Sequence, residues 1–142
     1  MRRFAALGVI LAIIFTTARA LAAQTAPVPA KKAIDVYKEY QAAVKTAKAL
    51  ADVLPFLTKQ YRTNLQGAPQ DMQDRMFKRM QEDGGWKNIV VTKETVKADT
   101  CELEATSTGP DGKAMKGKIA FKNEGGAWKI EGQGWVPDFG KK

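Results

Sequence analysis

The chain has 142 residues, with 23 basic and 15 acidic side chains and no histidine, so its formal net charge is +8 at pH 7. The basic residues are spread along the chain and are not gathered with aromatic residues, which argues against a nucleic-acid-binding protein. Without histidine, the usual near-neutral acid–base group and the commonest metal ligand are both missing. The length suits one domain with one hydrophobic core.

Residues 1–22 have the three parts of a secretory signal peptide. Arg2 and Arg3 supply the positive start, residues 4–15 form an uncharged apolar run, and small residues suited to cleavage follow. The alternative is an uncleaved anchor, but the apolar run is shorter than the roughly 20 residues that span a membrane. We predict cleavage after Ala22, export to the periplasm or the medium, and no stable membrane anchor afterwards.

The first part of the mature chain is predicted to be a lead-in followed by a helix. Residues 23–31 contain two prolines and no periodicity, which is typical of a flexible segment. A helix is expected over about 32–50, because its apolar residues fall near one stripe. Asp52 is then expected to cap a short turn that holds Pro55 in its first turn. The domain proper is predicted to span residues 32–137, with a tail at 138–142.

Two further helices are predicted before the strands begin. Thr58 is a good N-cap for a helix that runs to about Leu65 and ends at Gly67. Pro69 can start another helix, which the pair of glycines at 84–85 would end. This last helix carries a stripe of methionines four residues apart, which favours packing on the sheet over a soft ligand surface. The stripe consists of Met72, Met76 and Met80.

The last third of the chain reads as four short strands separated by turns. Strands are expected over about 89–96, 100–106, 114–122 and from Trp128 onward, with turn residues at 109–112 and 123–126. Short loops favour an antiparallel meander, because parallel neighbours need long crossovers. The predicted fold class is therefore α+β, with N-terminal helices packed on a curved antiparallel four-stranded meander sheet.

The alternation within these strands predicts which residues are buried. Cys101, Leu103 and Ala105 share one face of their strand, so the single cysteine is expected to be a core residue rather than a reactive thiol. Trp128 and Ile130 are expected to face the core for the same reason.

The pattern resembles that of small exported domains of the nuclear transport factor 2-like superfamily, which have the cystatin-like α+β cone. Two parts carry the resemblance: residues 50–62, and the strand turn at 96–101 with the closing hairpin E-G-G-A-W-K-I at 124–130. Ala98 stands where that family usually has glycine. The resemblance implies a concave sheet closed by helices. It does not imply one activity, because such folds include both enzymes and binding proteins.

The sequence contains no catalytic, metal-binding or cofactor-binding pattern, so none is assigned. We predict a non-enzymatic exported domain that binds a small apolar or amphipathic ligand, or a partner protein; a homodimer is compatible with the sequence. An apolar lining with a few hydroxyl or indole donors would suit such a ligand, although the same side chains could simply fill the core. The residues expected near a pocket are Tyr37, Tyr61, Met76, Trp86 and Phe121.

The alternative function is an isomerase- or dehydratase-like enzyme that uses tyrosine and aspartate side chains inside the cone. A buried carboxylate next to a tyrosine would favour this enzyme, whereas a cavity lined by methionine and aromatic side chains would favour a binding protein. The residues considered for the enzyme are Tyr37, Tyr40 and Tyr61 with Asp52, Asp71 or Asp74.

Overall fold

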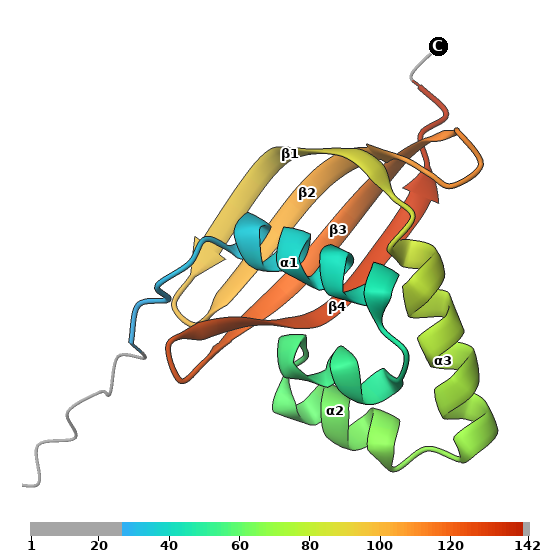
Figure 1. The fold of residues 1–142 in the computed structure, drawn as a ribbon. Coiled ribbons are helices and arrows are strands. Elements are labelled where there is room, and N and C mark those ends of the chain that lie inside the picture. The colour runs from blue at the N-terminus through green and yellow to red at the C-terminus, as the bar shows by residue number, and fades with distance from the viewer. Residues whose placement is uncertain (1–26, 141–142) are drawn as a thin grey trace, which may run out of the picture.

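The computed structural model describes residues 27–140, in which three α-helices and two short 3-10 turns precede one sheet (Figure 1). The predicted signal peptide lies outside the described residues. The α-helices are α1 (Ala33–Thr46), α2 (Lys59–Gln66) and α3 (Gln70–Asp83), and the 3-10 turns are η1 (Leu50–Asp52) and η2 (Leu54–Phe56). The strands are β1 (Lys87–Lys97), β2 (Thr100–Thr108), β3 (Ala114–Glu124) and β4 (Ala127–Pro137).

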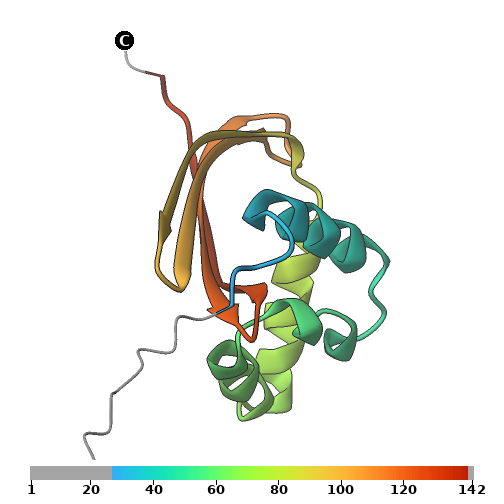
Figure 2. The same cartoon turned by 90° about the vertical axis from the view of Figure 1, so that its left-hand side faces the viewer.

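The sheet is an antiparallel meander in which each strand pairs with the next along the chain, in the order β1-β2-β3-β4. Viewed along its edge, the sheet is curved, and the helices all lie on one side of it (Figure 2). The α+β fold with helices on a curved meander sheet is therefore confirmed.

The core lies between α1 and the concave face of the sheet. On β2 the buried side chains alternate as predicted, and Cys101, Leu103 and Ala105 are each at most 2% exposed. Burial raises the pKa of the Cys101 thiol to about 11, so the thiol stays protonated at neutral pH. Across from them, α1 contributes its own apolar stripe. The fully buried large side chains include Tyr37, Tyr40, Val44, Ile119, Phe121 and Ile130.

The helices begin and end at the predicted capping residues, except at the C-terminal end of α1. Thr58 caps α2, its hydroxyl accepting a hydrogen bond from the Tyr61 backbone N–H at 3.2 Å, and Gly67 ends that helix. The first helix ends at Thr46, four residues earlier than predicted. The Asp52 side chain accepts hydrogen bonds from the backbone N–H groups of residues 48 and 49, so it closes the turn before it instead of capping the one after it.

A bulge in β4 decides which of its residues face the helices. Phe121 pairs with Ile130 and Ala120 pairs with Gly132, so Glu131 is an extra residue with no partner. Beyond it the alternation is reversed, which places Gln133 on the concave side that Ile130 also faces. Strict alternation would have turned it to the outer face.

Turn geometry also departs from the usual glycine pattern at the β1–β2 connection. Ala98 has a φ of 38°, in the left-handed region that glycine tolerates best. This is the position where the resembled family usually has glycine.

The lead-in is described from Pro27 onward and has neither helix nor strand. The Pro27 carbonyl accepts a hydrogen bond from the Asn123 side chain at 2.6 Å, which fastens this segment to the β3–β4 hairpin. Within residues 27–140, no helix is long and apolar enough to cross a membrane.

Candidate functional site

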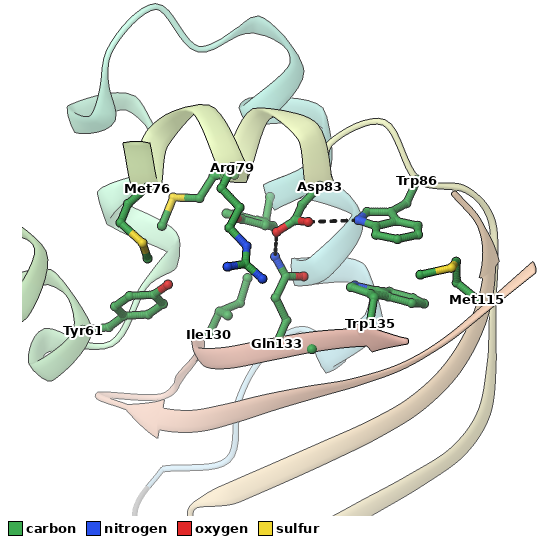
Figure 3. A pocket seen from close by; sticks show the side chains of 12 residues that line it. Tyr61, Met76, Arg79, Asp83, Trp86, Met115, Ile130, Gln133 and Trp135 are labelled. Atoms are coloured by element: carbon green, nitrogen blue, oxygen red, sulfur yellow. Dashed lines mark hydrogen bonds between the residues drawn. The ribbon is translucent and has the colours of Figure 1, made fainter. Parts of the chain in front are cut away.

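A cavity of about 450 Å³ opens between α3 and the second half of β4 (Figure 3). Its walls come from every helix and from the last two strands. Most of the lining is aromatic or carries a thioether, with a few polar groups at one side. The lining residues are Tyr40, Tyr61, Met76, Arg79, Met80, Asp83, Trp86, Met115, Ile130, Gln133, Gly134 and Trp135.

The carboxylate in this cavity belongs to Asp83, the last residue of α3. It accepts two hydrogen bonds, from Trp86 Nε1 at 3.3 Å and from Gln133 Nε2 at 2.9 Å. Burial raises the pKa of Asp83, while the Trp86 hydrogen bond and the positive charge of Arg79 act in the opposite direction. Asp83 therefore connects the helix, the following loop and β4 at the polar side of the cavity.

Tyr37 on α1 fixes the side chain of Gln133 from the side opposite Asp83. The Tyr37 hydroxyl donates to Gln133 Oε1 at 2.5 Å, so the amide nitrogen of Gln133 is the group that faces Asp83. Burial raises the pKa of Tyr37, which keeps this hydroxyl protonated and able to donate. The result is a continuous hydrogen-bonded chain from α1 through β4 to α3.

Two stacked tryptophans form the far wall of the cavity. The rings of Trp86 and Trp135 lie 4.9 Å apart between centroids at an interplanar angle of 21°, a favourable stacked arrangement. Trp135 lies over Gly117 of the neighbouring strand, where a Cβ atom would come within 2.4 Å of the indole ring. The glycine is therefore what allows the ring to lie flat on the sheet.

The structure brings together three of the five residues predicted to surround a pocket. Tyr61, Met76 and Trp86 line the cavity. Tyr37 is fully buried and reaches the cavity only through Gln133, whereas Phe121 is a core residue that does not line it.

The methionine stripe of α3 divides along its length. Met80 is 4% exposed and packs in the core, Met76 lines the cavity, and Met72 is 46% exposed. The end of the helix is thus buried, with Met80 in the core and also at the edge of the cavity, while Met76 in the middle of the helix forms part of the cavity wall.

Sequence reasoning missed Asp83, Gln133 and Trp135. One signal was present for Asp83. A negative charge at the C-terminal end of a helix is unfavourable because of the helix dipole, so an aspartate at this position indicates that it makes compensating contacts. For Gln133 and Trp135 no such signal existed, because their facing depends on the β4 bulge.

The aspartates first considered for catalysis lie elsewhere. Asp52, Asp71 and Asp74 are all exposed, and none lines the cavity. Over residues 27–140, no cluster of three or more histidine, cysteine, aspartate or glutamate side chains could hold a metal ion.

Comparison with known proteins adds no assignment. No protein-family model matches this chain, and no curated protein is significantly similar to it in sequence.

The buried position of Asp83 predicts a pH-dependent loss of stability. Because its pKa is raised in the folded state above the ordinary value of 3.8, the folded protein binds this proton more tightly than the unfolded chain does. This contribution is full below about pH 3.8 and is lost as the pH rises through the raised folded pKa. Urea unfolding at a series of pH values should show this decline in the wild type, and Asp83→Asn should remove it.

The matched control is Asp74→Asn, which changes an exposed aspartate on the same helix and should leave the wild-type pH profile in place. A wild-type profile that Asp83→Asn does not alter would contradict the assignment of this decline to Asp83.

Proposed function

We propose that this domain binds a small amphipathic organic molecule in the cavity between α3 and β4. The observation that carries the proposal is the lining itself: seven of the twelve residues around about 450 Å³ are aromatic or carry a thioether, and Arg79, Asp83 and Gln133 add polar groups. Ligand sites for small molecules typically have volumes of 300–1,000 Å³ and this same mixture of apolar walls and few polar groups.

The arrangement of the side chains supports a binding site over a filled core. Tyr61, Met76 and Trp86 remain only partly buried, although each contributes a large apolar surface to the cavity. Asp83 and Gln133 are held in fixed positions by their hydrogen bonds. Side chains that are held in place lose less conformational entropy when a ligand binds.

The compartment proposed for this binding is inferred from the sequence. The predicted signal peptide and the resemblance to exported domains of the nuclear transport factor 2-like superfamily support binding outside the cytoplasm. A partner protein is the alternative occupant. A shallow hollow of about 480 Å³ on the strands, lined in part by Thr92, Lys118 and Val136, is where such a partner would have to bind.

A second candidate function is proton-transfer catalysis of the isomerase or dehydratase kind. The specific observation in its favour is that Asp83, whose pKa is raised by burial, lines the same cavity as Tyr61. A carboxyl group whose pKa is raised by burial is better suited to general acid–base work than an exposed one. This carboxylate differs from the three that the sequence suggested, and the proposed role belongs to Asp83 alone.

The binding proposal is tested by thermal shift with a broad set of lipids and aromatic compounds. A ligand that occupies the cavity at 100 times its dissociation constant should stabilise the protein by about 2.7 kcal/mol. Met76→Trp, which fills the cavity, should abolish the shift. Met72→Trp places the same ring on the exposed part of the same helix and should preserve it. If no compound shifts the melting temperature, protein–protein interaction becomes the better hypothesis.

Compounds that bind also separate binding from catalysis. Incubation in heavy water followed by mass spectrometry of the compound should show deuterium uptake if Asp83 transfers protons, and Asp83→Asn should stop it. Bound compounds that take up no deuterium would support a binding protein.

A further inference from the structure

Arg79 is the unpaired charged group at the cavity. It lies one helical turn before Asp83 on α3, and Figure 3 shows its guanidinium turned into the cavity between Tyr61 and Gln133. Within residues 27–140 the guanidinium makes no ion pair within 4.0 Å and no hydrogen bond. By contrast, Arg75, one turn earlier, pairs with Asp71 at 2.8 Å.

The indole nitrogen of Trp135 is a further donor next to the cavity, but it is not exposed to it. The indole Nε1 of Trp135 is buried and has no hydrogen-bond partner among the described residues. The nitrogen-bearing edge of this ring faces Gln133 (Figure 3). Because this nitrogen is buried and lies beside the Tyr37 hydroxyl, it is not available to a ligand, and Arg79 is the free donor of the cavity.

The only carboxylate of the cavity is already engaged. Each oxygen of Asp83 accepts one hydrogen bond, Oδ1 from Trp86 and Oδ2 from Gln133. The N–H groups of Arg79 are therefore the largest set of unused donors at the cavity, whereas Asp83 already accepts two hydrogen bonds. These unused donors of a cationic group favour a ligand head group that accepts hydrogen bonds and carries negative charge.

We propose that the ligand of this cavity is an amphipathic carboxylate, whose head group is bound by Arg79 and whose apolar part lies against the methionine and aromatic side chains of the lining. The inference rests on the proposed binding function and specifies its ligand class. Arginine suits this role because its planar guanidinium can hold both oxygens of a carboxylate at once.

The test compares three probes of equal chain length: octanoate, octanamide and octylamine. Isothermal titration calorimetry with the wild-type protein should rank octanoate tightest and octylamine weakest. Arg79→Met keeps an unbranched apolar stem and removes the charged guanidinium, so it should weaken octanoate about tenfold, as expected for loss of a charge-assisted contact. The same variant should leave octanamide nearly unchanged. Arg75→Met is the matched control on the same helix and should change none of the three.

One further variant and the adverse outcomes complete the test. Asp83→Asn removes the negative charge near the proposed head group, so octanoate should bind at least as tightly as to the wild type. Tightest binding of octylamine, or equal effects of Arg79→Met and Arg75→Met on octanoate, would overturn the carboxylate assignment while leaving a binding cavity. Failure of all three probes to bind, together with an empty thermal-shift screen, would instead reject the binding function itself.

Discussion

Trp128→Ala is expected to lower the free energy of unfolding by about 3–5 kcal/mol, the range found for large-to-small aromatic changes in protein cores. Trp128 is only 7% exposed and belongs to the core that α1 and the sheet share. It also stands between two surface hollows of about 360 and 340 Å³, which the lead-in borders. Its removal would join them and admit water. Since domains are stable by only about 5–15 kcal/mol, this is a large fraction of the total.

Guanidinium chloride unfolding followed by circular dichroism measures this change without depending on the lost fluorophore. The control is Phe139→Ala, which removes an aromatic side chain that is 89% exposed and should alter stability by no more than about 0.5 kcal/mol. A loss below about 1 kcal/mol for Trp128→Ala would show that this tryptophan contributes little to the core.

The parts of the fold that the sequence predicted are those governed by neighbouring residues. Alternation with a period of two placed Cys101 and Leu103 on the buried face, because successive side chains of a strand point to opposite sides. Thr58 and Gly67 marked the ends of a helix through local capping chemistry. These signals operate within a few residues, and they are readable from a single sequence.

The end of α1 shows where this local reading fails. Apolar residues continue past Thr46 on a helical stripe, but the chain leaves the helix there and the Asp52 carboxylate holds the next turn. A side chain that can bond to backbone groups on either side of it offers the chain two alternatives of similar energy. Packing against the rest of the domain selects one of them, and that selection is not visible in the local sequence.

The candidate site could be predicted only in part for a related reason. Tyr61, Met76 and Trp86 attract attention because they are large and apolar in predicted helices or next to one. Asp83 and Gln133 are 50 positions apart in the chain and meet only after α3 has packed over β4. The bulge at Glu131 then reverses the facing of the last part of β4. One extra residue thus decides whether Gln133 reaches the cavity, and the position of this bulge cannot be read from the local sequence.

The cavity wall depends on a contact that one methyl group would destroy. Gly117→Ala would place its Cβ within 2.4 Å of the Trp135 ring, far below any ordinary contact. The ring cannot move aside without leaving its stack on Trp86. We therefore expect a loss of stability of about 1–3 kcal/mol, typical of overpacking, and a loss of ligand binding. Urea unfolding, near-ultraviolet circular dichroism of the tryptophans and the thermal-shift assay measure the three effects.

Two companion variants separate this clash from the general effect of adding a methyl group to a strand. Gly132→Ala on the adjacent strand meets no atom within 4 Å and should cost no stability. Trp135→Ala removes the ring that Gly117→Ala collides with, so the alanine at 117 should cost almost nothing in that background, giving a coupling of about the same size as the original loss. Additive effects in this cycle would mean that the cost of Gly117→Ala does not come from contact with Trp135 and that the cavity wall is held by other contacts. A strong coupling would identify Gly117 as the residue that lets Trp135 form the far wall of the cavity.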